Sequence, residues 1–410
     1  MALADLLQDW DHDHGLIDQK LDTCFQALQD RKAALKLSGT DSFKAGDHAP
    51  SDVRDDNLQL SGQQNERCHT VMPDICAPLT PAALEWLQSS EPLLDHATSA
   101  AADWQMLSAR KALSTLCAKY ELKYADLARH SAELGLDILG IDDHAQHIQE
   151  MLEGLQSNEG WTVSHKSDLE VLYKHVKGQP FHSVRMEAVL DAPIEHALAM
   201  AVEFDLVKTW NRYVRDSVIL HAEKRRYPLL SYLYGSMWTP FVIIDACVKA
   251  EAYDTGEEDR SMLVSLSNMT EKDIANYGPL PEGHERHLRG VVGPNSCLRL
   301  EALPPSADGR PRTKGTVLAH LDPRVPFVPA FLVNFMLKVA SPFAFRMMKK
   351  VLAGLFHDPQ GEYSQRLKAK PEVYAAVQAR TKELMKKVYG IDEYAGVQQP
   401  AQKQRSAKLR

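Results

Sequence analysis

The stretch DPRVPFVPAFLVNFMLKVASPFAFRMMKKVL, residues 322–352, decides how the rest of the chain is interpreted. Its three prolines, at 323, 326 and 329, predict an extended approach, because proline lacks the N–H that a helix interior needs. A helix can begin near Pro329. Apolar residues then recur every three or four positions, at Phe331, Leu332, Phe335, Met336 and Val339. Polar residues interrupt this run well short of the roughly 20 residues that cross a bilayer. We therefore expect an apolar helix that covers another part of the protein.

Composition is that of a soluble protein of about two or three domains, with 410 residues, 44% of them hydrophobic and 25% charged. The acidic start, MALADLLQDWDHDH, lacks the features of a secretory signal, so we expect a cytoplasmic protein. Its six cysteines form no CxxC pair, which favours reduced thiols over disulfides or a zinc site. Neither a cofactor nor a metal is indicated.

Charge divides the chain into two unlike parts. Residues 1–160 contain 12 basic and 27 acidic side chains, a net charge of −15, and residues 161–410 contain 35 and 28, a net charge of +7. This excess permits weak attraction to anionic surfaces but is not typical of nucleic-acid binding. The basic residues of the final helix, Arg346, Lys349 and Lys350, could meet anionic lipid head groups or form a solvated helix face.

The order of patterns predicts six segments. Helical spacing over 1–37 is followed by a polar linker over 38–77 and a helical region over 78–157, in which one helix runs from Leu127 to Leu139 and stops at Gly140. A domain rich in strands covers 158–356, a helical extension covers 357–390, and a disordered basic tail covers 391–410.

Two-residue alternation after Gly160 predicts strands, because alternate side chains of a strand lie on opposite faces. Strands are expected around 169–173 and 183–190, and over 217–222, 228–234, 241–253, 261–268, 286–303 and 313–321, with a helix over 194–204 after the second. In the strand over 241–253, one face is apolar and the other carries Asp245, Lys249 and Glu251. We therefore expect a largely antiparallel sheet with one wet face, its apolar face covered by the helix described above.

Four segments in this order resemble the START family of lipid-transfer domains, over about residues 161–352: LEVLYKHVKGQPFHSVRMEAVLDAP (169–193), EFDLVKTWNRYV (203–214), HLRGVVGPNSCLRLEAL (287–303) and DPRVPFVPAFLVNFMLK (322–338). Trp210, Arg289, Asp322, Pro329 and Asn334 match family positions, whereas Asn211 stands where the family usually has Asp. The resemblance implies an α+β helix-grip fold, a curved antiparallel sheet wrapped around a long C-terminal helix, here preceded by a helical region.

The same resemblance implies a tunnel between sheet and helix that holds one lipid, and a protein that is not an enzyme. The strand that carries the buried Arg–carboxylate pair of the cholesterol-binding members has Val248 and Ala250 here, which disfavours a sterol recognised in that way. The predicted tunnel residues are Met186, Tyr232, Tyr234, Trp238, Val248, Arg289, Phe331, Phe335, Met336 and Val339.

Each of these residues has a structural alternative. The four on the final helix either touch ligand or pack in a core, and Trp238 either gates the tunnel mouth or anchors a hairpin. Arg289 either neutralises a lipid head group or pairs with a structural carboxylate, and Arg185 has the same two alternatives. Strand parity does not decide which face Tyr232 and Tyr234 occupy. His284 and His287 lack the spacing of a metal site.

Three functions stay open on the sequence. The first is lipid binding and transfer, with a lipid ligand, transient contact with a membrane surface and no nucleic acid as partner. The second is an enzyme of the helix-grip superfamily, a cyclase acting on a hydrophobic substrate. The third is a lipid-sensing scaffold that recruits a protein partner through the N-terminal helices.

Overall fold

The computed structural model describes residues 84–391 except positions 86, 89–90, 177–178, 212–213, 223–228, 240–241, 278, 323, 325–340 and 357. Two compact units, Met1–Ala77 and Pro78–Arg410, divide the chain, and every described residue belongs to the second. The predicted N-terminal helices, the linker and the tail from 392 onward lie outside the described residues, as does the first half of the expected final helix.

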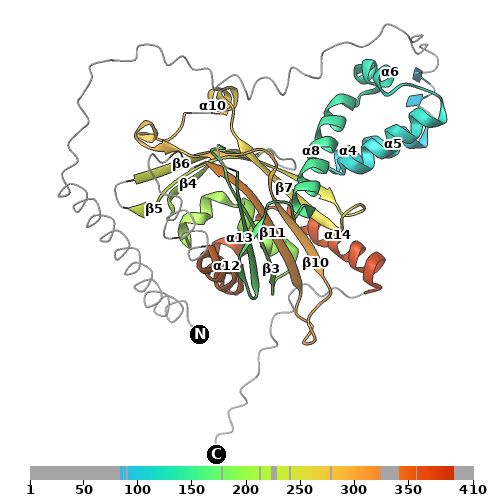
Figure 1. The fold of residues 1–410 in the computed structure, drawn as a ribbon. Coiled ribbons are helices and arrows are strands. Elements are labelled where there is room, and N and C mark those ends of the chain that lie inside the picture. The colour runs from blue at the N-terminus through green and yellow to red at the C-terminus, as the bar shows by residue number, and fades with distance from the viewer. Residues whose placement is uncertain are drawn as a thin grey trace, which may run out of the picture. The chain divides into compact units, whose positions relative to one another are not determined.

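A large sheet forms the centre of the second unit (Figure 1). Its long strands are antiparallel and follow the spatial order β1-β2-β3-β11-β10-β7-β6-β5-β4. Their bounds are β1 (Thr162–Lys166), β2 (Leu169–His175), β3 (His182–Leu190), β4 (Val214–Ala222), β5 (Leu229–Thr239), β6 (Val242–Thr255), β7 (Ser261–Asn268), β10 (Ser296–Leu303) and β11 (Arg312–Asp322). Outside residues 286–303, the alternation in the sequence therefore forms strands where it predicts them.

The single strand expected over 286–303 is wrong, because the structure divides this segment. A 3-10 turn, η3 (His284–Arg286), leads to β8 (Leu288–Arg289), which pairs in parallel with β6, and to β9 (Val291–Val292), which pairs with β11. Before β10, the chain turns through Pro294, which has no N–H for a ladder, and Asn295, whose φ of 60° is left-handed.

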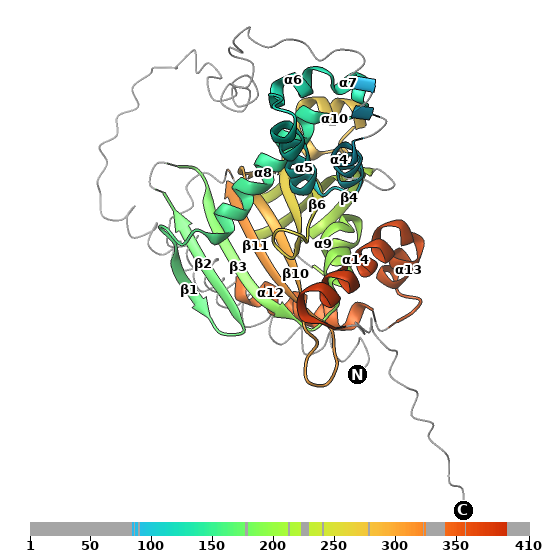
Figure 2. The same cartoon turned by 90° about the vertical axis from the view of Figure 1, so that its right-hand side faces the viewer.

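The inner face of the sheet, as we name the face that packs on the later helices, carries the main core. Leu169, Ala188, Ala250, Val264 and Leu300 belong to one buried cluster with helix α9 (Ile194–Val202) and the C-terminal helices. These are α12 (Ser341–Leu355), α13 (Glu362–Ala369) and α14 (Pro371–Tyr389). Figure 2 shows them gathered with α9 at one end of the curved sheet. The α+β helix-grip prediction is confirmed in the described residues.

The outer face of the sheet, opposite the inner face, is not the wet surface that the sequence predicts. Neighbours of inner-face residues along the strands, such as Tyr253 and Leu263, are buried in a second cluster with the helical region. That region comprises α4 (Pro92–Ala102), α5 (Met106–Lys119), α6 (Tyr124–Arg129), α7 (Ser131–Leu134) and α8 (Ile138–Gln156). Because α8 packs an apolar stripe against β11, helices cover this face as well (Figure 2).

Helix boundaries in this region also differ from the pattern. The helix predicted from Leu127 to Leu139 is two short helices, because Gly135 has a left-handed φ of 66° and ends α7. Asp137 then caps α8 by accepting a hydrogen bond from Gly140 N at 2.9 Å, so Gly140 lies in the first turn of a helix and not at the end of one.

Arg185 of β3 fastens α8 to the outer face. Its guanidinium donates to the carbonyl oxygens of Leu155 and Ser157, at 2.8 and 2.7 Å, and to Asn158 Oδ1 at 2.6 Å. These acceptors lie at the C-terminal end of α8, where carbonyl groups lack partners within the helix. Arg185 therefore has the structural role and not the ligand role that the sequence left open.

The C-terminal helices clamp α9 onto the inner face through one buried carboxylate. Glu203, which is 1% exposed, accepts hydrogen bonds from Lys370 Nζ at 2.7 and 2.8 Å, from Arg366 at 3.3 Å and from the Tyr374 hydroxyl at 2.5 Å. Trp210 adds a hydrogen bond to Tyr363 at 2.9 Å. Among the helices that the structure describes, none is long and apolar enough to cross a membrane.

Candidate ligand-binding site

Apolar side chains on the inner face are the candidate walls of a ligand site. Close to α9 they are fully buried, but Met186 of β3, Leu266 of β7 and Leu298 of β10 stay half-buried beside the same cluster. Met348 and Val351 of α12 are half-buried against it as well. Sheet and helix thus both contribute half-buried apolar side chains at the edge of one cluster, which is the chemistry that a hydrophobic ligand needs.

Two predicted site residues lie on the inner face. Met186 lies opposite Val171 of β2 on one side and Val317 of β11 on the other, and it packs beside the inner cluster. Val248 is 6% exposed and lies two residues before Ala250, so strand alternation puts both on the same face. Contact of either residue with a ligand stays a prediction.

Three predicted residues lie on the outer face. Tyr232 is buried in a small cluster with Leu230 and Cys247, and Tyr234 packs beside it. Because Leu229 and Ala250 of the same strands belong to the inner cluster, alternation directs Tyr232 and Tyr234 the other way. Arg289 joins them through Asp245. These side chains therefore cannot line a cavity on the inner face.

Asp245 organises this outer cluster. Its side chain is 0% exposed and accepts two hydrogen bonds from Arg289, from Nε to Oδ1 at 2.5 Å and from the terminal nitrogen to Oδ2 at 3.1 Å. The Tyr232 hydroxyl lies 3.1 Å from the same Oδ2 and 3.0 Å from His287 Nδ1. The hydrogen bond to Asp245 raises the pKa of Arg289. Arg289 therefore pairs with a structural carboxylate.

The remaining predicted residues are not placed. Trp238 belongs to β5, but its side chain lies outside the described residues. Phe331, Phe335, Met336 and Val339 also lie outside the described residues, so their contact with a ligand stays a prediction.

Titratable side chains decide whether the part of the chain that the structure describes offers a metal-binding group or a reactive thiol. It contains no group of three His, Cys, Asp or Glu side chains that could hold a metal ion. Burial raises the pKa of the Cys247 thiol to about 11, so this cysteine is a poor nucleophile at neutral pH. His287 is engaged with Tyr232 and stacks on the Tyr234 ring, with 4.7 Å between centroids.

Helix α12 is amphipathic and separates the apolar interior from a charged pocket. Phe345 and Leu352 are buried in the inner cluster, whereas Arg346 and Lys350 are exposed and Lys349 is half-buried. Arg346 and Lys349, three positions apart, are neighbours on the helix surface, whereas Lys350 directly follows Lys349 and extends in another direction.

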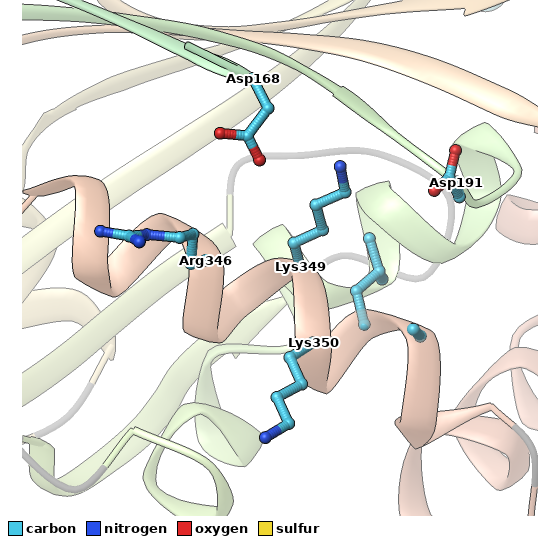
Figure 3. A pocket seen from close by; sticks show the side chains of 7 residues that line it. Asp168, Asp191, Arg346, Lys349 and Lys350 are labelled. Atoms are coloured by element: carbon cyan, nitrogen blue, oxygen red, sulfur yellow. The ribbon is translucent and has the colours of Figure 1, made fainter. Parts of the chain in front are cut away.

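The charged pocket has a volume of about 340 Å³ and lies between α12 and one end of the β2–β3 hairpin. It is lined by Asp168, Asp191, Arg346, Lys349, Lys350, Leu352 and Ala353. Figure 3 shows Lys349 reaching toward the sheet between the two aspartates, while Lys350 points away from Asp168. A hydrogen bond from Ser167, at 2.8 Å, and the nearby charges of Lys349 and Arg346 lower the pKa of Asp168.

Sequence reasoning identified the three basic residues of this pocket but not the two aspartates. Asp168 immediately precedes β2 and Asp191 immediately follows β3. Because these strands are antiparallel neighbours, both carboxylates come to the same end of the sheet. The predicted pair of antiparallel strands could have placed the two aspartates at one end of the sheet. The sequence did not show that α12 passes this end.

The fold and this site together define an α+β protein whose apolar inner face is closed by helices. No protein-family model matches the chain, and no curated protein matches it.

Solved structures similar to the chain include StAR-related lipid transfer proteins. Human STARD10 is 15% identical, with a TM-score of 0.43, over 57% of this chain and 87% of that one. Human StAR-related lipid transfer protein 5 is 16% identical, with a TM-score of 0.37, over 58% and 94%. A STAR-related lipid transfer protein fragment from Xanthomonas axonopodis is 21% identical, with a TM-score of 0.36, over 48% and 99%.

Proposed function

We propose that the chain is a START-like lipid-binding and lipid-transfer protein that holds one hydrophobic ligand between the inner face of the sheet and the final helix. The observation that carries the proposal is the set of half-buried apolar side chains that sheet and α12 contribute beside the inner cluster, Met186, Leu266, Leu298, Met348 and Val351. Location in the cytoplasm and transient contact with membranes belong to the same proposal.

The proposed mechanism is reversible exchange. A lipid chain that leaves water for an apolar interior gains about 0.8 kcal/mol for each buried CH₂ group, so a long chain is held firmly during transit. Release then requires that helix α12 or its approach move away from the sheet at a membrane, where the chain finds an equally apolar environment. No covalent step is involved.

The first test is native mass spectrometry of the purified full chain, together with a transfer assay between vesicles. We expect a bound lipid and measurable transfer. Met186→Trp should fill the interior and lower both signals, whereas Leu139→Trp, which adds the same ring at a 52% exposed position of α8, should change neither. Absence of bound lipid and of transfer for every lipid class would refute the proposal.

The alternatives stay predictions without a specific observation in their favour. A cyclase-like enzyme needs convergent titratable groups on the inner face, and the buried cluster around Asp245 lies on the outer face. A lipid-sensing scaffold would act through the N-terminal helices over 1–37, which lie outside the described residues.

A further inference from the structure

Helices α13 and α14 follow α12 and lie outside the stretch of about residues 161–352 that resembles the START family. We name residues 362–389, which comprise both helices, the strap. The strap contains seven basic and three acidic side chains, a net charge of +4. It packs on α9, and Figure 2 shows it beside that helix. It is therefore a positively charged addition to the sheet and its closing helix.

Ion pairs attach the strap to the rest of the protein. Near its start, Lys370 and Arg366 both contact Glu203, and they keep 33% and 34% of their side chains exposed while Glu203 keeps 1%. Further along, Arg380 donates to Asp254 of β6 at 2.8 Å. At the start of the strap, the basic partners are thus open to solvent and the acidic partner is not.

These ion pairs fix the position of the strap more than they stabilise it. Burial removes the hydration of a carboxylate, and this cost offsets much of the attraction between the partners of a buried ion pair. If another anion binds Lys370 and Arg366, Glu203 is left with the Tyr374 hydroxyl, and one neutral donor does not offset the burial of a charge. Lifting the strap returns Glu203 to water. A competing anion therefore favours the lifted strap.

Helix α14 has the composition that suits an anionic membrane surface. Its buried stripe includes the apolar side chains Tyr374, Val377, Leu384 and Met385. Its exposed side chains include Lys382, Lys386 and Lys387. A basic amphipathic helix lies in a membrane interface with its apolar face toward the lipid chains and its cations at the head groups. A membrane therefore provides new partners for the stripe and for the cations, whereas a soluble anion provides them for the cations alone.

The strap also holds the end of α12. Phe356, which directly follows α12, stacks on His196 of α9 with 3.8 Å between ring centroids. On its other side, the Phe356 ring lies 5.7 Å from the ring of Tyr363 in the strap. Trp210 donates a hydrogen bond to the Tyr363 hydroxyl at 2.9 Å. Because the end of α12 is held between α9 and the strap, lifting the strap removes one of its two contacts.

We propose that an anionic membrane surface releases the strap. Lipid phosphates take Lys370 and Arg366 from Glu203, α14 moves into the membrane interface, and the end of α12 becomes free to leave the inner face. The inference rests on the proposed lipid-binding function and specifies what starts the exchange of its ligand.

Vesicles of phosphatidylcholine, with or without phosphatidylglycerol, test the proposal on the full chain. Hydrogen exchange in α9, which the strap covers, reports whether the strap is lifted, and α5 is the internal reference. We expect vesicles that contain phosphatidylglycerol to speed exchange in α9 but not in α5, and phosphatidylcholine alone to change neither. If both kinds of vesicle speed exchange in α9 equally, or if neither does, charge does not release the strap and the proposal is overturned.

Two variants lift the strap by opposite changes of charge. Arg366→Gln/Lys370→Gln removes two cations, whereas Glu203→Gln removes their partner and leaves both cations in place. Both variants should speed exchange in α9 without vesicles. Vesicles with phosphatidylglycerol should bind Glu203→Gln about 25-fold more tightly than the double variant, because each cation near an anionic surface contributes about fivefold in affinity. Equal affinities would leave these residues a structural role only and contradict the proposal.

Lys272→Gln and Glu372→Gln are the matched controls. Each removes one charge at an exposed position, the first on α10 (Glu271–Tyr277) and the second on the strap itself. Neither should speed exchange in α9. If either does so as strongly as Glu203→Gln, exchange responds to net charge and not to the buried contact, and the proposed release is wrong.

A last arm separates a membrane from a soluble anion. Inorganic phosphate replaces the vesicles at matched ionic strength, and we expect exchange in α9 to stay unchanged. Exchange as fast as with anionic vesicles would assign the release to a soluble anion and overturn the proposal. If exchange responds to vesicles as expected but the chain neither holds nor transfers lipid, the proposed function fails while the release of the strap stands.

Discussion

Replacement of Asp245 by Asn separates a structural ion pair from a ligand contact. The Asp245 side chain is 0% exposed and holds Arg289, whose own side chain is 34% exposed. Asn keeps the shape but loses the charge, so two charge-assisted hydrogen bonds from Arg289 weaken and the Tyr232 hydroxyl loses its anionic acceptor. We therefore expect Asp245→Asn to destabilise the fold while leaving the ligand site intact.

The magnitude follows from these contacts. Hydrogen bonds to charged groups contribute about 1.5–3 kcal/mol each, and removal of one partner of a buried pair costs about 3–5 kcal/mol. Because Arg289 keeps a third of its side chain in water, the cost of leaving it unpaired is smaller. We expect the free energy of unfolding to fall by about 2–3 kcal/mol for Asp245→Asn. Arg289→Gln added to it should cost little more, because the two residues act as one unit.

Urea unfolding followed by circular dichroism measures both changes, and native mass spectrometry measures the bound lipid in the same samples. Both variants should retain the lipid content of the unmodified protein. If Arg289→Gln alone strips the lipid while stability is unchanged, Arg289 touches the ligand. The assignment of this cluster to a structural role on the outer face would then be wrong.

Three further changes test the packing of helices on the sheet. Arg185→Met should lower the free energy of unfolding by about 2–3 kcal/mol, because three hydrogen bonds to the end of α8 are lost. Hydrogen exchange should become faster at this end of α8 than in α5. Equal exchange rates in both helices would contradict the capping role of Arg185. Tyr374→Phe should cost about 1–2 kcal/mol and loosen α14, since the hydroxyl donates to buried Glu203; unchanged exchange in α14 would contradict this. Burial raises the pKa of Glu195 above its ordinary value of 4.5. Ionisation of this buried carboxyl group therefore costs free energy in the folded state, and the fold loses stability as the pH rises above 4.5. Glu195→Gln should therefore stabilise the protein by about 1 kcal/mol at pH 7, with a gain that disappears below pH 4.5 in pH-dependent unfolding; a gain that persists there would exclude ionisation as its cause.

Much of the fold follows from short-range patterns in the sequence. Alternation with a period of two residues predicts the strands from 169 to 321 because it reports which side chains share a face. Helical spacing predicts α9, α12 and α14 for the same local reason. Breaks were less predictable: Gly135 interrupts a helical pattern only because the chain turns there to begin α8.

The candidate site was predictable in part. Met186 and Val248 were assigned to the apolar face, and that is where they lie. For Tyr232, alternation left two faces open, and for Arg289 the sequence left open a lipid head group or a structural carboxylate as its partner. The buried carboxylate of Asp245, on the outer face, is the partner of both. Asp168 and Asp191 belong to the candidate site because α12 returns, more than 150 residues later, to the end of the hairpin that carries them.

The sequence by itself determined the fold class, most of the strands and an amphipathic final helix. Only the tertiary structure decided that helices cover both faces of the sheet, which side Tyr232 and Arg289 take, and that charges from α12 meet two aspartates. The physical reason is that periodicity depends on neighbours a few residues apart. What covers a face, and which charges lie across a pocket, depend on the register and path of segments far apart in the chain.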